Sequence, residues 1–295
     1  MLSIVRALPR LAAGLAFGLS VTATVAAAAE TRFAGLEEAV AAVENQLGAR
    51  VGLSIVDTGS ETAWFHRKDE RFLMNSTFKV PLCGAVLARV DAGTLSLDDK
   101  LNVEQKDIVS YAPVTEKRVG AEMTIDALCR AAIDISDNTA ANMLIDHLGG
   151  PRAVTRFFES TGDTVSRLDR SEPDLNTFIA GDPRDTTTPV AATGMLSALL
   201  LGDVLSPGSR DQLREWMSHG GVTGKLLRDK APKGWRIFDK SGSGSHSRNL
   251  VAVVVPEGRA PWIVTIFISD VNAPFETRNA ALKSLSGAVA AAIED

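Results

Sequence analysis

Residues that build metal centres and disulfide frameworks are scarce in this chain. Its 295 residues include two cysteines and four histidines, and neither a His-x-x-x-His nor a Cys-x-x-Cys spacing occurs. Such close spacings are typical of zinc sites, so we predict that the protein binds no metal, and we expect no cofactor. The histidines are predicted to be surface or structural residues; they stand at positions 66, 147, 219 and 246.

The sequence also lacks an excess of basic residues and any apolar run long enough to cross a membrane. Lysine and arginine together number 31 against 36 acidic residues, which gives a formal charge of −5. This balance argues against nucleic acid or an anionic membrane as a partner. It leaves room for a small anionic substrate, because the local charge of a pocket decides what the pocket binds.

Residues 1–29 differ in composition from the rest of the chain. They contain Arg6 and Arg10 but no acidic residue, continue with an apolar stretch around Leu11–Val21, and end in four alanines. This pattern predicts a secretory signal peptide cleaved near Ala28 or Ala29. A membrane anchor is the alternative, but the stretch is shorter than the roughly 20 residues that a span needs. Without these residues the formal charge becomes −7, and we expect an exported, soluble product in the periplasm or outside the cell.

Cys83 and Cys129 are the only cysteines, so a single pairing is possible. In an exported protein such a pair is expected to be oxidised. A disulfide would stabilise the fold by roughly 4 kcal/mol in the chain-entropy model. Two reduced thiols in the core are the alternative.

The order of predicted elements indicates an α+β fold with a discontinuous sheet lobe. Helical periodicity is clearest at 36–47, 127–133, 138–148, 188–201, 207–217 and 281–293, and strand patterns at 51–57, 62–66, 249–255 and 262–269. Strands from the two ends of the chain can pair in one antiparallel sheet flanked by the terminal helices. We therefore predict one domain over 30–295, with an α/β lobe at about 30–73 and 218–295, an all-α lobe at about 74–217, and a site between the lobes.

Three polar motifs occur in an order that suits one shared active site. Ser76-Thr-Phe-Lys79 comes first, Ser136-Asp137-Asn138 second and Lys240-Ser241-Gly242 third, and Glu172-Pro-Asp-Leu-Asn176 lies between the last two. Each motif alone could be an ordinary helix cap or a charged surface loop. In combination the motifs resemble those of the class A β-lactamases, and the resemblance runs from about Ala34 to the C-terminus.

The resemblance implies acyl transfer through a covalent intermediate on Ser76. Ser76 at the start of a helix would be the nucleophile, with Lys79 on the same helix face. Ser136 would relay a proton to the departing lactam nitrogen, and Asn138 would hold Lys79 and the substrate amide. Pro81 stands close to the helix start, where we expect a local adjustment of the backbone.

Glu172 is the residue that separates turnover from permanent acylation. By resemblance, Glu172 and Asn176 would bind the water that hydrolyses the acyl-serine, and Arg170 and Asp185 would close their loop as an ion pair. We also expect a cis peptide bond before Pro173. Either Lys79 directly or Glu172 through water could be the acylation base, and the sequence leaves both open.

Five further positions are predicted to contact the substrate. Lys240 and Ser241, on a strand before a glycine-rich turn, suit the carboxylate of a penicillin, and the backbone N–H groups of Ser76 and Ser243 would form the oxyanion hole. Arg248 could add a second positive contact or lie at the surface, because the turn before it is one residue shorter than in common members. Tyr111 could line the substrate site, or it could simply pack in the protein core. The resemblance also supports the Cys83–Cys129 disulfide.

The sequence thus predicts a monomeric hydrolase of the β-lactam ring that acts on penicillins and on some cephalosporins and so confers β-lactam resistance. The alternatives are a penicillin-binding D,D-peptidase and a penicillin-sensing receptor domain, which both stop at the acyl-serine. Glu172 and Asn176 argue against both. Carbapenem hydrolysis is not expected, because neither Asn75 nor Gly244 is a cysteine.

Overall fold

The computed structural model describes the backbone of residues 17–295 and the side chains of residues 31–295. Most of the predicted signal peptide, residues 1–16, lies outside the described residues, and residues 17–29 form the first part of helix α1 (Phe17–Leu47). The signal peptide therefore stays a prediction.

A five-stranded antiparallel sheet forms the centre of the molecule, in the order β2-β1-β9-β8-β7. Its strands come from both ends of the chain: β1 (Arg50–Asp57), β2 (Ala63–His66), β7 (Arg236–Ser243), β8 (Arg248–Val255) and β9 (Trp262–Ser269). Register pairs Ser243 with Arg248 at one end of β7 and β8. The α+β fold predicted from the sequence is confirmed.

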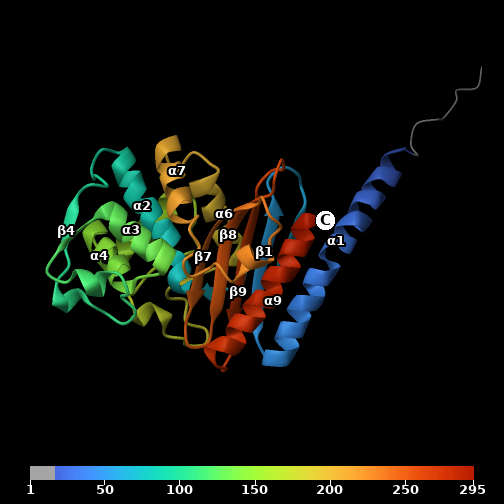
Figure 1. Cartoon of the computed structure of the whole chain (residues 1–295). Helices are drawn as coiled ribbons and strands as arrows, with labels where there is room; N and C mark the ends of the chain where they lie inside the picture. Colours follow the sequence, from blue (N-terminus) through green and yellow to red (C-terminus); the bar gives the residue numbers. More distant parts are fainter. Residues whose placement is uncertain (1–16) are drawn as a thin grey trace, which may run out of the picture.

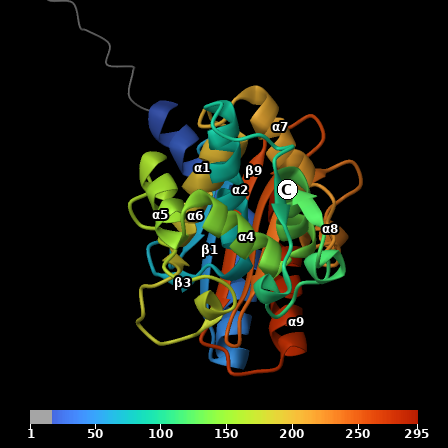
Figure 2. The same cartoon turned by 90° about the vertical axis from the view of Figure 1, so that its left-hand side faces the viewer.

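Helices cover both faces of this sheet (Figure 1). Helix α1 and the C-terminal helix α9 (Phe275–Glu294) lie side by side on one face, with the short α8 (Leu227–Lys230) against α9. Helix α6 (Pro189–Leu200) packs on the other face, against β1, β8 and β9. The remaining helices lie beyond it: α2 (Lys79–Asp91), α3 (Ile125–Arg130), α4 (Asn138–Leu148), α5 (Pro151–Ser160) and α7 (Pro207–Trp216). Figure 2 shows α2, α4 and α5 in front of the sheet.

Short elements connect the helical lobe to the sheet. Two small antiparallel pairs are β3 (Phe72–Leu73) with β6 (Thr186–Thr187), and β4 (Lys100–Asn102) with β5 (Glu122–Thr124). Single 3₁₀ turns span Asn75–Phe78, Gln105–Asp107, Thr115–Arg118 and Asp174–Asn176, and a π turn spans Ala131–Ile135. The two 3₁₀ turns at 75–78 and 174–176 carry predicted site residues.

Two hydrophobic cores share the sheet as a common wall. Ile263 and Phe267 of β9 belong to the core under the helical lobe, whereas Val264 and Ile266 belong to the core under α1 and α9. All eight residues of β9 are buried, because this strand is covered on both faces. Its sequence is therefore a continuous apolar run rather than an alternating one.

Candidate active site

The nucleophile segment crosses from the sheet lobe to the helical lobe. Ser76 lies in the 3₁₀ turn Asn75–Phe78 directly before α2 and is 9 % exposed. The α-helix proper begins at Lys79, so Pro81 falls in its first turn, where a backbone N–H has little to bond to. The expected adjustment around Pro81 is this change from 3₁₀ to α geometry. Ser76 is thus presented at the N-terminal end of α2.

Lys79 is completely buried beneath this serine. Its Nζ donates to Ser136 O at 2.9 Å and to Asn138 Oδ1 at 2.6 Å, and lies 3.2 Å from Glu172 Oε1. Burial lowers the pKa of Lys79, and the neighbouring Glu172 carboxylate opposes that shift. Within residues 31–295 no hydrogen bond joins Lys79 Nζ to Ser76 Oγ. The lysine instead connects the second motif to Glu172.

The second motif lies where a π turn meets α4. Ser136 ends the turn in a left-handed conformation, with φ 66°, and Asp137 caps α4 by accepting from Ala140 N at 2.8 Å. Asp137 Oδ2 also accepts from the backbone N–H groups of Val114 and Thr115. This carboxylate therefore ties the loop before residue 115 to the helix.

The third motif lies on the edge strand β7. Lys240 Nζ donates to Ser136 Oγ at 3.0 Å and to Ser241 O at 2.7 Å, so Ser136 Oγ lies between two lysines, with Lys79 Nζ 3.5 Å away. Burial lowers the pKa of Lys240 far below its usual range, and the positive charges of Lys79 and Arg248 lower it further. Lys240 and Arg248 form no ion pair within residues 31–295, so this end of the pocket is suited to an anion.

Gly242 allows β7 to approach the nucleophile closely. A Cβ at this position would lie 2.9 Å from Met74 O and 3.2 Å from Ser76 N. Any larger residue would push the strand away. The close approach brings β7, which ends at Ser243, against the backbone of Ser76.

Arg248 reaches the pocket despite the short turn before it. Its Nη1 donates to Gly242 O at 3.0 Å and its Nε to Asn279 Oδ1 at 3.0 Å, and the residue is 5 % exposed. Burial lowers the pKa of Arg248 to about 10, and the charge of Arg278 contributes. The surface alternative for Arg248 is wrong.

Glu172 is held under the pocket by its backbone and its side chain. Asn142 of α4 accepts from Glu172 N and donates to Glu172 O, both at 2.8 Å. Asn176 Nδ2 donates to Glu172 Oε2 at 2.5 Å. The Glu172–Pro173 bond is cis, so the expected isomer is confirmed.

The loop that carries Glu172 is closed by a buried ion pair. Arg170 Nε lies 2.6 Å from Asp185 Oδ2, and the Asp185 side chain is fully buried. Asp185 Oδ1 also accepts from the N–H groups of Asp169 and Arg170. One carboxylate thereby fixes both ends of the loop. This arrangement agrees with the predicted pairing.

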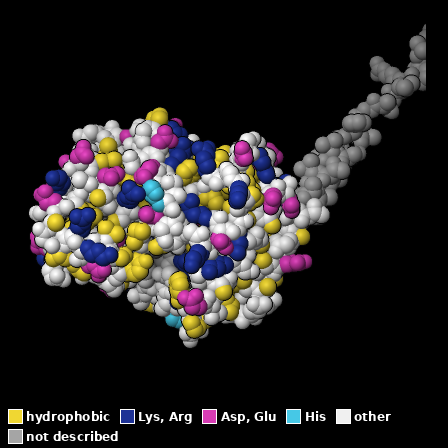
Figure 3. Space-filling model, in the orientation of Figure 1, with side chains coloured by type: hydrophobic (Ala, Val, Ile, Leu, Met, Phe, Trp, Pro, Cys, Tyr) yellow, Lys and Arg dark blue, Asp and Glu magenta, His cyan; other side chains and the backbone are white. Residues whose placement is uncertain are grey.

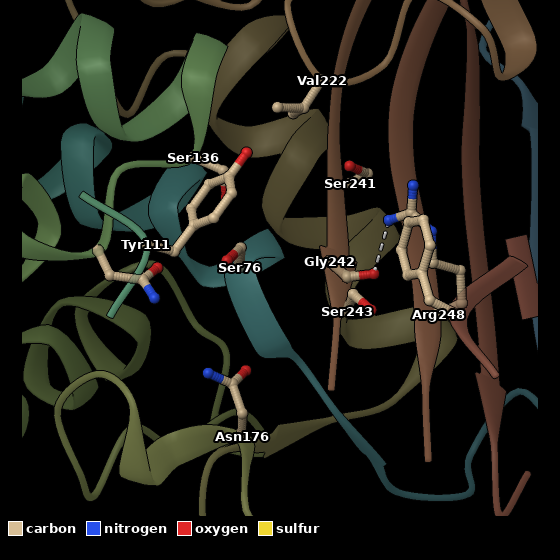
Figure 4. Close-up of a pocket in the computed structure, with 11 residues that line it drawn as sticks. Ser76, Tyr111, Ser136, Asn176, Val222, Ser241, Gly242, Ser243 and Arg248 are labelled. Atoms are coloured by element: carbon tan, nitrogen blue, oxygen red, sulfur yellow. Dashed lines mark hydrogen bonds between the residues drawn. The ribbon is translucent and has the colours of Figure 1, made fainter. Parts of the chain in front are cut away.

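Residues of all three motifs line a pocket of about 430 Å³. Figure 4 shows Ser76 and Ser136 on one wall, Ser241, Ser243 and Arg248 on the facing strands, and Asn176 at the lower edge. Tyr111 lies over the opening, is 57 % exposed, and its carbonyl accepts from Asn138 N. Tyr111 therefore lines the pocket rather than packing in the core.

Basic and acidic side chains are interspersed on the face seen in Figure 3.

Sequence reasoning missed several residues of this site. Asn142 follows Asn138 by one helical turn, and that spacing was a usable signal. Val222 and Phe275 line the pocket from outside the motifs. The Phe275 ring packs against the Arg248 guanidinium, 5.2 Å from Cζ to the ring centroid. No local pattern marks either residue, because both reach the site only through the tertiary fold.

The predicted disulfide is not formed in this structure. Cys83 of α2 and Cys129 of α3 are free, buried thiols. Burial raises the pKa of Cys129 well above its usual range, and the adjoining Cys83 thiol adds to the rise. The correct two side chains are therefore neighbours in the core, but in the reduced form given as the alternative.

Two features that would mark other kinds of site are not found in the described part of the chain. No three His, Cys, Asp or Glu side chains among residues 31–295 come together as a metal site. None of the described helices is both long and apolar enough to cross a membrane.

The chain matches proteins of known activity over nearly its whole length. The family described as "Beta-lactamase enzyme family" matches residues 35–293. The β-lactamase of Rhodobacter capsulatus is 64 % identical over 288 residues, which cover 98 % of both chains. β-Lactamase PSE-4 of Pseudomonas aeruginosa is 40 % identical and covers 93 % of this chain and 96 % of its own.

The fold is also similar to those of solved β-lactamase structures. An ancestral class A β-lactamase, GNCA, superimposes with a TM-score of 0.83 at 48 % identity and covers 86 % of this chain and 98 % of its own. A β-lactamase from Xanthomonas campestris superimposes with a TM-score of 0.84 at 42 % identity, covering 88 % and 97 %.

Proposed function

The chain belongs to the class A β-lactamase family and hydrolyses the amide bond of β-lactams, and from this premise we propose which residue performs each step. The peptidase and sensor alternatives are not favoured. The assignment rests on one observation above all: the Glu172 carboxylate is buried beside the pocket, between Lys79 and Asn176.

In acylation, Ser76 Oγ attacks the lactam carbonyl carbon. The N–H groups of Ser76 and Ser243 donate to the oxygen that becomes negative, a contribution worth roughly 3–4 kcal/mol per donor. The C–N bond then breaks, and the nitrogen takes a proton from Ser136 Oγ. Lys240 Nζ, 3.0 Å from Ser136 Oγ, and Lys79 Nζ, 3.5 Å away, can each restore that proton.

The proton of Ser76 itself has two possible acceptors. Burial lowers the pKa of Lys79, so its ammonium gives up a proton more readily to form the amine that can act as a base. Glu172 can receive the proton through a water instead. Because Lys79 Nζ and Glu172 Oε1 are 3.2 Å apart, the two groups can also exchange it.

The anionic end of a penicillin is the group that the basic side of the pocket fits. Lys240, Ser241 and Arg248 converge there, and Arg248 keeps Nη2 available after its bonds to Gly242 and Asn279. We therefore assign penicillins as the main substrates, with some cephalosporins.

In deacylation, Glu172 removes a proton from a water that Asn176 helps to hold. The hydroxide attacks the acyl carbon, the bond to Ser76 Oγ breaks, and Oγ regains a proton. A general base contributes about 10²–10⁴ in rate. Without it the acyl-serine would persist.

The decisive experiment is Glu172→Gln with benzylpenicillin. We expect acyl-enzyme on Ser76 to accumulate in the intact-mass spectrum, and turnover to fall by about 10²–10⁴. Asp174→Asn is the matched control, because Asp174 is an exposed acid in the same loop and should leave turnover unchanged. If Glu172→Gln turns over normally, Glu172 is not the deacylation base.

The cellular setting is also part of the proposal. We propose that residues 1–29 direct export and are removed, that the protein works as a monomer in the periplasm or outside the cell, and that it confers β-lactam resistance. In that oxidising setting the neighbouring Cys83 and Cys129 would form a disulfide.

A further inference from the structure

A chain of three carboxamides, of which Asn75 and Asn249 are buried and Asn176 is half-buried, connects the backbone before Ser76 to the Glu172 side chain. It starts at Asn249 of β8, whose Nδ2 lies 2.8 Å from Leu73 O and 3.1 Å from Met74 O. Carbonyl oxygens only accept hydrogen bonds, so the nitrogen of this carboxamide has to face them. The main chain thereby fixes the orientation of Asn249.

Asn75 takes its orientation from Asn249. The Asn249 nitrogen lies 3.0 Å from Asn75 Oδ1, and Ser247 Oγ donates to the same oxygen at 2.6 Å. Asn75 Nδ2 is then free to donate in the opposite direction. Asn75 is fully buried and has φ 45°, a left-handed conformation that asparagine tolerates better than most residues.

The chain ends at the deacylation residues. Asn75 Nδ2 donates to Asn176 Oδ1 at 2.9 Å, and no other donor within residues 31–295 reaches that oxygen. Asn176 Nδ2 consequently faces Glu172 Oε2 at 2.5 Å, and Pro173 O at 3.2 Å favours the same orientation. A reversed Asn176 would put an oxygen against the Glu172 carboxylate, which is repulsive.

We propose that Asn75 is a positioning residue for deacylation: it holds the Asn176 carboxamide with its nitrogen toward Glu172, so that both can bind one water. The inference rests on the proposed role of Glu172. Asn75 contacts no reacting atom, and its effect on catalysis passes entirely through Asn176.

The test compares acylation and deacylation rates of Asn75 variants by rapid-quench mass spectrometry with benzylpenicillin. Asn75→Gly suits the left-handed backbone and removes the donor without adding charge. We expect deacylation to slow about tenfold, as for a misplaced catalytic group, while acylation stays close to wild type. Asn75→Asp should slow deacylation further, because its carboxylate turns an oxygen toward Asn176 Oδ1.

A double variant separates positioning from general loosening. In an Asn176→Ala protein, adding Asn75→Gly should cause no further slowing, because the residue through which Asn75 acts is already gone. Independent, multiplicative losses would overturn the proposal, as would normal deacylation in both Asn75 variants.

Two variants outside the helical lobe complete the test. Asn249→Ala removes the start of the carboxamide chain and should also slow deacylation, which covers the case that an Asn75 variant does not fold. Ser247→Ala removes the other donor to Asn75 Oδ1 and should likewise slow deacylation. Normal turnover by Glu172→Gln would overturn the proposed role of Glu172, whereas these outcomes concern Asn75 alone.

Discussion

Lys240 occupies a position that disfavours its own charge. It is fully buried, and no carboxylate within residues 31–295 forms an ion pair with it. Its pKa is lowered, so the ammonium is present only at a pH below that lowered value and is lost as the pH rises through it. Binding of a substrate carboxylate should weaken over the same range.

This reasoning predicts the basic limb of the pH profile. For benzylpenicillin, kcat/KM of the wild-type protein should fall at a pH well below the usual lysine range. Lys240→Arg should move the fall to higher pH, because a guanidinium stays charged. The measurement is kcat/KM from pH 6 to about pH 11, an upper limit chosen to lie near the ordinary pKa of lysine. An unmoved limb would assign the titration to Lys79 instead.

At this scale the sequence identifies reactive residues but not their orientation. Ser76, Lys79, Ser136 and Glu172 could be named because each belongs to a motif a few residues long. The orientation of Asn75 could not, since it depends on partners 101 and 174 residues away in the sequence. The sequence records that an asparagine is present but not which way its carboxamide is turned.

Among the elements, the loop from Arg170 to Asp185 depends most on a single side chain. Asp185 is buried and accepts from both Arg170 and the backbone of the loop. Asp185→Ala would leave Arg170 with a buried, uncompensated charge. We expect a loss of about 3–5 kcal/mol in the free energy of unfolding, measured by urea denaturation, together with slower deacylation. Arg184→Ala, in an exposed pair of the same loop, should change stability far less; equal losses would contradict the argument.

The two cysteines are neighbours on helices α2 and α3, and the disulfide proposed for the exported protein would join these helices. Protein purified from the periplasm is expected to contain no free thiol when denatured and titrated with Ellman's reagent. Its thermal unfolding temperature should fall on reduction, consistent with roughly 4 kcal/mol of cross-link stabilisation. Cys83→Ser/Cys129→Ser should unfold at one temperature with or without reductant. Two titratable thiols in the periplasmic protein would show that the reduced pair is the working form.

Prediction of elements succeeded where a periodic pattern was long. The predicted helix at 138–148 and strand at 262–269 have the observed bounds. The pairs β3–β6 and β4–β5 could not be predicted, because strands of two or three residues contain no measurable period. The π turn before Ser136 likewise depends on packing between α3 and α4.

For the whole molecule, the boundary of the folded unit is set by α1. Among the side chains of this helix from residue 31 onward, the first buried ones are Phe33 and Leu36, followed by Val40 and Val43. A chain of residues 30–295 should therefore unfold at the same temperature as the full-length protein. A chain of residues 44–295 should not fold, because four buried apolar side chains at about 1.5–3 kcal/mol each approach the whole stability of a domain. Early unfolding of the 30–295 chain would show that residues before 30 belong to the fold.

The sheet lobe built from both ends of the chain has a consequence for how the polypeptide could be cut and rejoined. Helix α9 ends beside α1, and Arg259 donates to Glu294 O near that end (Figure 1). A short linker could therefore join residue 295 to residue 30, with new termini opened at Gly93, an exposed turn residue at which an added Cβ would meet nothing within 4 Å. Such a circular permutant would read the motifs in the order Ser136, Glu172, Lys240, Ser76. The active site depends on the meeting of two lobes, so it should tolerate this reordering of the motifs.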